Sequence, residues 1–444
     1  MEMEAWALVM FAVAIAVLLL GYPVAFTLGA VAMLFGTVFL GLDFLNLLPM
    51  RIWGIMTNFT LLAVPMFVFM GIVLEKSGIA EELLETMGLL FGRIRGGLAV
   101  SIVIVGAMLA ATTGVVGATV VTMGVIALPA LLKHGYAPGL ATGTIAASGT
   151  LGQIIPPSII LILLGDVIGV PVGRLFMGAI TPGLMLIALF IAFILVYAWW
   201  KPKSAPVVTL DIPDGVDSPV LGLRIVKSLL PPLLLIIMVL GSIFFGIASP
   251  TESAAVGALA AMILAALHRR LTYVNLQQAM RQTTRLTSMV FLILIGATAF
   301  GLVFRGMGGD VLVEDLMMMI PGGEWGFLAV SMLLIFVLGF FLDFLEICFI
   351  VVPILAPIAD SLGIDLLWFA VLIAVNLQTS FLTPPFGFSL FYLKATAPKS
   401  VTIGHIYKGI IPFVAIQLVT LSLLILYPQT TLWLPDWIDQ MMGY

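Results

Sequence analysis

The chain has 444 residues, of which 62% are apolar and only 9% are charged, and its mean hydropathy is +1.25. Soluble domains are about half apolar and about a quarter charged, so 18 basic and 22 acidic side chains could not cover a soluble 47.5 kDa globule. The composition excludes a soluble enzyme, a disordered chain and a nucleic-acid-binding protein, and it predicts an all-α polytopic membrane protein.

Residues that usually carry redox or metal chemistry are scarce. One cysteine, Cys348, excludes an internal disulfide and a cysteine-based metal cluster. Three histidines (His134, His268 and His405) lie far apart in sequence, which argues against a haem or copper enzyme, and we expect them to be solvated. No P-loop string and no catalytic set of His, Ser and Asp is present. We therefore expect a protein that is not an enzyme and carries no cofactor.

Apolar stretches recur along the whole chain, and a bilayer core takes about 20 apolar helical residues. They cover residues 5–21, 23–40, 52–74, 97–133, 139–165, 176–199, 229–247, 253–267, 286–305, 326–359, 366–393 and 410–427. The stretches 97–133 and 326–359 are too long for one pass and carry polar or glycine-rich residues in the middle. Each is predicted to be a broken helix or two passes joined by a tight turn.

One polar segment divides the chain almost in half. Residues 201–228 carry charges and prolines but are too short for a domain, so they are predicted to be a cytoplasmic linker. The division prompts a search for a repeat. We expect N-terminal scaffold helices in residues 1–50, repeat unit one with a hairpin and broken helices in 51–200, central scaffold helices in 229–285, repeat unit two in 286–427 and an interfacial tail in 428–444.

The two halves share short motifs in the same order. The string Leu-Ala-Val-Ser at residues 98–101 recurs at 328–331, an offset of 230 residues. The double proline Pro156-Pro157 recurs as Pro384-Pro385, an offset of 228 residues. Single matches arise by chance, but a colinear series with a nearly constant offset predicts an internal repeat.

Loop charges indicate that the two units are inverted. Arg93, Arg95 and Lys133 lie in turns of unit one, whereas Glu324 and Asp365 lie in the equivalent turns of unit two. Basic loops stay in the cytoplasm, so equivalent loops are expected on opposite sides of the membrane, although chance scatter of charge would give the same pattern. Inverted repeats with broken helices are typical of alternating-access secondary transporters.

A first pair of polar sites lies in the two overlong stretches. Unit one has hydroxyls and glycines at Thr112, Thr113, Gly114, Gly117 and Thr119, which can unwind a helix and expose carbonyls. The position equivalent to Thr113 in unit two is a carboxylate, Asp343. A carboxylate at membrane depth is a functional candidate by default, and the alternative is a residue that faces water or pairs across helices.

A second pair surrounds the double prolines. Each member combines hydroxyls or amides with a proline pair, which interrupts the helical hydrogen-bond ladder and frees carbonyls. Such carbonyls can bind Na⁺, and the helix N-terminus beyond can hold an anionic substrate. The candidate binding residues are Thr150, Gly152, Pro156 and Pro157 in unit one, and Asn376, Gln378, Thr379, Ser380, Thr383, Pro384 and Pro385 in unit two.

A third pair precedes these, at residues 52–74 and 286–305. Asn58 in the first aligns with Ser288 in the second, which also carries Gly296 and Thr298. We interpret both as re-entrant hairpins whose tips meet the broken helices; ordinary spans with small residues at packing faces are the alternative. The acids that follow, including Glu81 and Glu82, predict a short amphipathic helix that is either an arm between fixed and moving parts or a plain solvated face.

Three strings of this chain resemble the large membrane subunit of TRAP transporters, the tripartite ATP-independent periplasmic transporters. They are ASGTLGQIIPPS at residues 147–158, ASPTE at 248–252 and NLQTSFLTPPFG at 376–387. The resemblance covers essentially the whole chain, and the order of the segments agrees. One departure is the threonine-rich string at residues 112–117, where many relatives are serine-rich. Threonine keeps the hydroxyl, so the departure leaves open which side chains reach an ion.

This resemblance implies Na⁺-coupled uptake of an organic acid across the bacterial or archaeal inner membrane. It also implies a periplasmic solute-binding receptor, a small four-helix membrane subunit, and an elevator mechanism with a scaffold and a mobile transport domain. The double-proline variant with Asn376 and Gln378 is similar to a subgroup linked to 2-oxoacids, lactate or mannitol-type solutes. A stand-alone Na⁺/carboxylate symporter of the same superfamily, which needs no receptor, is the alternative.

Overall fold

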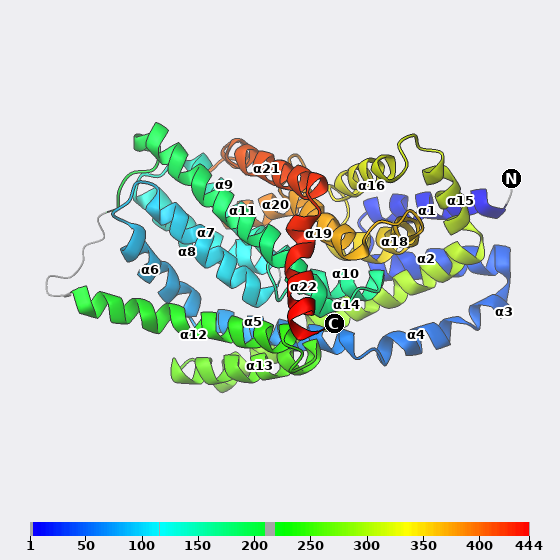
Figure 1. Ribbon diagram of the computed structural model, residues 1–444, viewed down its shortest axis with the longest axis horizontal. Helices are drawn as coiled ribbons and strands as arrows, with labels where there is room; N and C mark the ends of the chain where they lie inside the picture. Colours follow the sequence, from blue (N-terminus) through cyan, green and yellow to red (C-terminus); the bar gives the residue numbers. More distant parts are fainter. Residues whose placement is uncertain (1–2, 115, 209–217, 444) are drawn as a thin grey trace.

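The structure is a computed structural model that describes residues 3–114, 116–208 and 218–443 (Figure 1). The side chains of residues 80, 112, 113 and 218–225 lie outside this description. Within these ranges every regular element is a helix, as the composition predicts. Seven of the described helices are long and apolar enough to cross a membrane, or eight if the bent pair Leu42–Met56 and Thr60–Lys76 counts as one span.

The N-terminal helices are α1 (Met3–Leu19), α2 (Val24–Phe35), α3 (Leu42–Leu45) and α4 (Leu48–Met56). Unit one continues with α5 (Ala63–Lys76), α6 (Ile79–Phe91), α7 (Gly97–Thr113), α8 (Val116–Lys133), α9 (Pro138–Thr150), α10 (Ile159–Ile168) and α11 (Val172–Trp200). The central pair is α12 (Ser218–Phe244) and α13 (Pro250–Leu267). Unit two contains α14 (Tyr273–Gly306), α15 (Gly309–Met318), α16 (Glu324–Leu338), α17 (Phe344–Glu346), α18 (Val352–Ser361), α19 (Leu366–Leu382), α20 (Phe388–Thr396) and α21 (Ile403–Leu426), and α22 (Gln429–Met442) ends the chain.

The order of elements in unit one recurs in unit two. Two backbone features mark equivalent positions at the offsets found in the sequence. Gly78 and Gly308, which precede α6 and α15, have φ of 76° and 78°. Gly135 and Gly363, which precede α9 and α19, have φ of 78° and 77°. Because left-handed backbone favours glycine, these positions need glycine for the same reason in both units.

Each overlong stretch is two helices joined by a tight turn. In unit one, α7 ends at Gly114, whose φ of 61° lets the chain turn into α8. In unit two, α16 ends before Gly339, and Asp343 begins a new helix that runs through α17 and a π-helical turn into α18. Both stretches therefore form helical hairpins, here named hairpin one (α7–α8) and hairpin two (α16–α18).

The prediction of a re-entrant hairpin at residues 286–305 is wrong. This segment lies inside α14, which is continuous over 34 residues. Gly296 serves packing instead: a Cβ there would lie 3.1 Å from the Ala25 Cα of α2, so only glycine allows the two helices this close. In the equivalent region of unit one, the chain does bend, by 55° between Met56 and Thr60.

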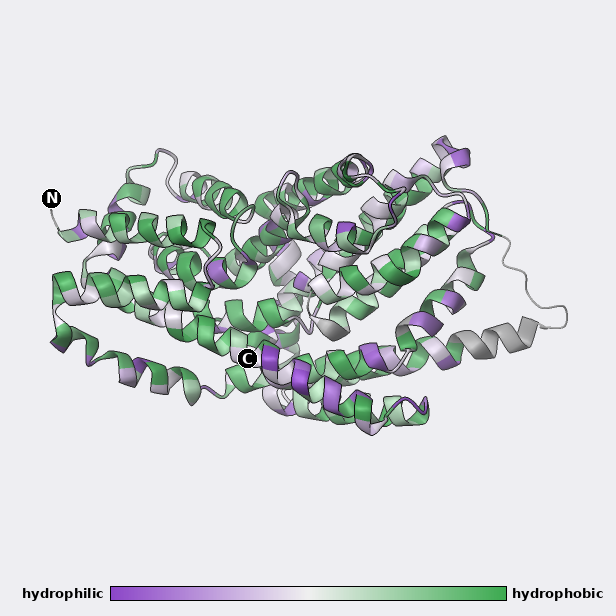
Figure 2. Cartoon of the chain, turned by 180° about the vertical axis from the view of Figure 1, so that it is seen from behind, coloured by the Kyte–Doolittle hydropathy of each residue, from purple (hydrophilic) through white to green (hydrophobic). Residues whose placement is uncertain are grey.

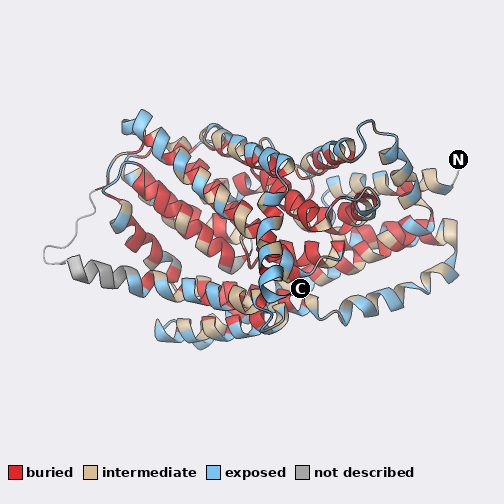
Figure 3. Ribbon diagram, in the orientation of Figure 1, coloured by how far each residue is buried: buried red, intermediate tan, exposed pale blue. Residues whose placement is uncertain are grey.

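The core of the molecule is formed by the two equivalent helices α9 and α19. All residues from Leu140 to Thr150 and from Leu367 to Leu382 are buried. Figure 3 shows buried residues gathered in the middle layer, while exposed residues lie on the outer helices. Those outer surfaces are largely apolar (Figure 2), with exposed side chains such as Trp53, Ile237 and Ile263, as expected of a surface in contact with lipid.

Candidate functional site

The polar segments that lead into the two double-proline breaks meet, because α19 contacts both α10 and the 3₁₀ turn Leu151–Gln153 that follows α9. The Gln378 side-chain amide donates a hydrogen bond to the Thr150 hydroxyl across 3.4 Å. These two residues occupy equivalent positions, 228 residues apart, and each lies six residues before the first proline of its break. Each break contains a cis Pro-Pro bond. The structure thus brings together the two polar segments that the sequence singled out.

Hairpin one rests against the first break through small residues. A Cβ on Gly152 would lie 3.1 Å from the Ala110 Cβ of α7, and one on Gly106 would lie 2.7 Å from the Ser148 Cβ of α9. The turn residue Gly114 faces Ile159 at the start of α10, and a Cβ on Gly114 would lie 3.1 Å from the Ile159 Cγ1 atom. The tip of this hairpin therefore sits at the point where α9 ends and α10 begins.

Hairpin two repeats this arrangement in unit two. A Cβ on Gly339 would lie 2.7 Å from the Ser380 Cβ of α19, the counterpart of the contact between Gly152 and Ala110. The Asn376 side-chain amide donates to the Met332 carbonyl of α16 across 2.7 Å. Both hairpin tips therefore approach the same central region as the two breaks.

The broken ladders leave backbone oxygens available at the breaks. The hydroxyls of Ser158 and Ser389 donate to the carbonyls of Gln153 and Phe381, which are equivalent positions, each across 2.9 Å. The Pro385 carbonyl accepts from Tyr407. Within the described part of the chain, the carbonyls of residues 156, 157 and 384 accept no hydrogen bond. Oxygen atoms of this kind are suitable ligands for a hard cation such as Na⁺.

The predicted hydroxyls of α19 bond to their own helix. Thr379, Ser380 and Thr383 donate to carbonyls three or four residues earlier, at 2.8 Å each. Their oxygens keep lone pairs that can accept or ligate, but in this conformation none of these three donates across the breaks.

The predicted residues of hairpin one are only partly described, because the side chains of Thr112 and Thr113 lie outside the described set. Thr119 is buried in α8. Gly117 faces the ring of Tyr392 in α20, where a Cβ would lie 3.2 Å from it. Hairpin one therefore also contacts the helix that follows the second break.

Asp343 begins the second helix of hairpin two. Its carboxylate accepts the backbone N–H of Phe344 across 2.7 Å, and its own N–H donates to the Glu346 carboxylate across 3.1 Å. This is a capping box, which satisfies N–H groups that a helix start leaves without partners. A role for Asp343 in cation binding stays a prediction.

The site prediction missed Gln153, which lies within the first break. Its side chain is fully buried, and neither amide atom has a hydrogen-bond partner in the described structure. The Gln378 amide oxygen also has none. The signal was present in the sequence, because an amide between a glycine and a double proline is unusual in an otherwise apolar run.

A cavity of about 720 Å³ opens between α4, α14, α18 and the C-terminal end of α10, which is the end away from the first break. The predicted residues Asn58 and Thr298 both line it, whereas Ser288 does not. The Asn58 amide donates to the Asp166 carboxylate of α10 across 2.6 Å, and its oxygen accepts from the Thr60 N–H. Asn58 therefore links the bend between α4 and α5 to the helix beyond the first break.

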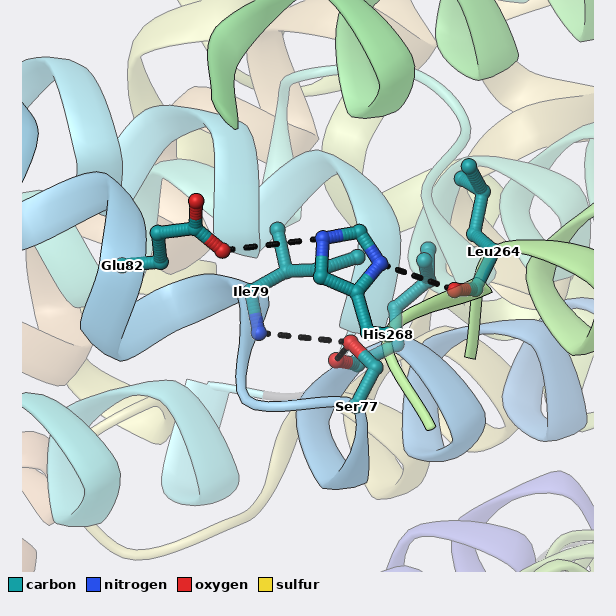
Figure 4. A network of polar contacts seen from close by, with 6 residues as sticks. Ser77, Ile79, Glu82, Leu264 and His268 are labelled. Atoms are coloured by element: carbon teal, nitrogen blue, oxygen red, sulfur yellow. Dashed lines mark hydrogen bonds and ion pairs between the residues drawn. The ribbon is translucent and has the colours of Figure 1, made fainter. Parts of the chain in front are cut away.

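The N-terminal end of α6 contacts the C-terminal end of α13, one of the two central helices (Figure 4). The His268 Nε2 atom lies 3.6 Å from a Glu82 carboxylate oxygen, and its Nδ1 donates to the Leu264 carbonyl across 2.8 Å. The His268 side chain is 26% exposed, so it keeps part of the predicted contact with solvent while these two contacts hold it. These contacts join α6 to the C-terminal end of α13.

With this geometry in hand, comparison with known proteins identifies the family. A family model described as "Tripartite ATP-independent periplasmic transporter, DctM component" matches residues 11–430. The chain belongs to this family. It is a TRAP large permease, a multi-pass protein of the inner membrane and not an enzyme, and the resemblance of its three strings to this subunit is confirmed.

Relatives match this TRAP permease over most of their length. The C4-dicarboxylate TRAP transporter large permease protein of Pseudomonas aeruginosa is 29% identical over 398 residues, covering 89% of this chain and 91% of that protein. The sialic acid permease of Vibrio cholerae is 29% identical, with 94% and 95% covered. The ectoine permease of Halomonas elongata is 29% identical, with 96% and 98% covered.

A solved structure shares the fold of this TRAP permease. The Alcanivorax borkumensis YdaH transporter superimposes with a TM-score of 0.63 at 14% sequence identity, and the match covers 96% of this chain and 98% of that one. At this identity the likeness shows the fold alone. The family model assigns the chain to the secondary transporters, and this likeness adds that its described, helical residues share the fold of that structure.

Proposed function

We propose that this permease imports a carboxylate-bearing organic acid across the inner membrane, driven by a Na⁺ gradient. A periplasmic receptor delivers the solute, and a small four-helix membrane subunit completes the transporter. The observation that carries the proposal is the hydrogen bond between Gln378 and Thr150, which joins the equivalent breaks of two related units. Paired breaks at the middle of a repeat are the usual place of substrate and coupling-ion sites in secondary transporters.

The breaks supply the ligands that Na⁺ coupling needs. Uncharged oxygens surround them: free carbonyls beside the prolines and the unpartnered amide oxygens of Gln153 and Gln378. The N-termini of α10 and α20 begin just beyond, where a partial positive charge favours an anionic group. A cation and a carboxylate can therefore occupy neighbouring positions, and each favours the binding of the other.

The hairpins and breaks form the transport domain in this proposal. It comprises α7–α10 and α16–α20, while the N-terminal and central helices form the scaffold. The contact between Asn58 and Asp166 connects the two sets of helices, so an elevator movement of α10 breaks it. The helices α6 and α15 act as arms between the two sets, and the contact between Glu82 and His268 anchors the first arm to the scaffold.

Reconstitution with chosen components tests this function. The purified chain is placed in proteoliposomes with the small subunit, the receptor is added outside, and uptake of labelled lactate, pyruvate, succinate and N-acetylneuraminate is measured. We expect uptake of at least one acid only with an inward Na⁺ gradient and all three proteins, because the longest polar segment within these 444 residues, the linker at 201–228, is too short to capture a solute. Strong uptake by the chain alone would favour the stand-alone symporter, and uptake driven by ATP or by a proton gradient without Na⁺ would contradict the proposal.

A further inference from the structure

The cavity between α4, α10, α14 and α18 has an uneven distribution of charge. The helices α4 and α14 contact each other and carry Arg51 and Arg305, and they are here named the arginine wall. The helices α10 and α18 also contact each other, carry Asp166 and Asp360, and form the opposite wall. Among the described residues, neither arginine forms an ion pair. Within the same residues, their side chains make one hydrogen bond, which Arg305 Nε donates to the Gly301 carbonyl across 3.3 Å. Most of the guanidinium donors on this wall are therefore free.

Two unpaired guanidiniums on one cavity wall indicate a negatively charged ligand. Both arginines are exposed, so an anion in the cavity can reach their guanidinium groups. The planar guanidinium offers paired N–H donors that match a carboxylate, and such charge-assisted bonds are about twice as strong as neutral ones. A volume of about 720 Å³ also lies within the range of small-molecule sites.

The carboxylates on the opposite wall restrict which chemical groups the other end of that ligand can carry. Asp360 has no ion pair in the described structure, and Asp166 accepts from Asn58 through one oxygen only. Carboxylates accept hydrogen bonds but repel a second negative charge. A ligand that spans the cavity thus fits best with a carboxylate at one end and a hydroxyl or ammonium group at the other.

We propose that Arg51 and Arg305 form a carboxylate-binding subsite at the entrance of the transport pathway, which the solute occupies before its carboxylate reaches the N-termini of α10 and α20 beside the cation site. The solute enters with its carboxylate on the arginine wall and its hydrogen-bond donor toward Asp166 and Asp360. This proposal rests on the proposed function, because it assigns a place to the transported acid. It adds the residues that select the charge of the solute and the chemical class that they select.

Kinetics of arginine variants in the reconstituted three-component system test the subsite. Arg51→Gln and Arg305→Gln each remove one charge-assisted contact, so we expect KM for the transported acid to rise about tenfold in each variant and further in the double variant, with a smaller change in maximal rate. Arg51→Lys and Arg305→Lys keep the charge and should lie between the wild type and the glutamine variants. Arg281→Gln, on the same helix α14 but outside the cavity, is the matched control and should keep the wild-type KM.

A binding measurement separates this inference from the proposed function. Lactate, which has a carboxylate and a hydroxyl, should raise the melting temperature of the detergent-purified chain, whereas neutral lactamide should not. The double glutamine variant should lose this protection. Protection that the double variant retains, or a wild-type KM in that variant, would overturn the subsite. Uptake without Na⁺ together with lost lactate protection in the double variant would overturn only the Na⁺ coupling.

Discussion

Replacing Gly409 with valine will abolish accumulation of the folded protein. Gly409 of α21 packs directly on Gly139 of α9, where a Cβ would lie 2.7 Å from the Gly139 carbonyl carbon and closer still to its oxygen. Gly143, one turn along α9, meets the Gly409 carbonyl in the same way. Overpacking a core costs on the order of 1–3 kcal/mol, and more where the obstacle is backbone that cannot move aside.

The yield of monodisperse protein after detergent extraction measures this effect. Gly404→Val is the matched control, because it makes the same change on the same helix, where the nearest atom to a Cβ is 3.7 Å away. We expect the control to retain the wild-type yield and Gly409→Val to lose nearly all of it. Equal yields and melting temperatures for the two variants would show that α9 and α21 do not pack this closely.

Asp343→Asn will raise the Na⁺ concentration needed for half-maximal uptake about tenfold or more. A carboxylate 4 Å from a cation contributes about 4 kcal/mol at an effective dielectric constant near 20, so even a part of this interaction exceeds a factor of ten. Asparagine is also a good N-cap and can accept the Phe344 N–H, so the start of α17 is preserved. The substitution therefore removes the charge without removing the cap.

Asp365→Asn is the matched control for this prediction. Asp365 also caps a helix, α19, by accepting the Trp368 N–H across 2.9 Å, but it lies at the opposite end of α19 from the break. Uptake measured over a series of Na⁺ concentrations should show a shift for Asp343→Asn and none for Asp365→Asn. An unchanged Na⁺ dependence in both would restrict Asp343 to its capping role and leave the cation to carbonyls and amides of the breaks.

Regular features with a local cause were predictable from the sequence. The capping box that starts α13 depends only on Ser249 and Glu252, two residues three apart in the sequence. The double prolines prevent α9 and α19 from continuing because proline cannot extend the ladder: α19 ends at Leu382, and α9 passes into a 3₁₀ turn at Leu151–Gln153. The turn at Gly114 follows from a glycine in a stretch too long for one pass.

Which apolar stretches form hairpins was harder to predict from the sequence than the caps and breaks. Residues 286–305 and 326–359 both combine apolar runs with small or polar residues, yet only the second is broken. Gly296 lies against α2, which is more than 250 residues earlier in the chain, so its role depends on a contact that sequence spacing does not show. A glycine at a packing face and a glycine at a break have the same local pattern.

The charged cavity was missed for a related reason. Arg51, Asp166, Arg305 and Asp360 come from four separate helices, and each alone resembles an ordinary charge near the end of an apolar stretch. Their shared position depends on the packing of α4, α10, α14 and α18, which no single motif encodes. Asn58 was selected because of its depth in an apolar segment, but its partner Asp166 was not.

The central claim is that the two units enter the membrane from opposite sides and meet at their breaks. The turn at residues 92–96 lies beside the linker, since Gly96 donates to the Ala205 carbonyl and Val208 donates to that of Gly92. The start of α16 lies at the far end of the molecule (Figure 1).

Labelling of Ile94→Cys and Glu324→Cys, each in a Cys348→Ala background, with a membrane-impermeant maleimide tests this claim most directly. In cells whose outer membrane is permeabilised and whose inner membrane is intact, position 324 should react with the maleimide. Position 94 should react only after the inner membrane is permeabilised as well. Reaction of both positions from the same side would contradict the inverted arrangement and the alternating access built on it.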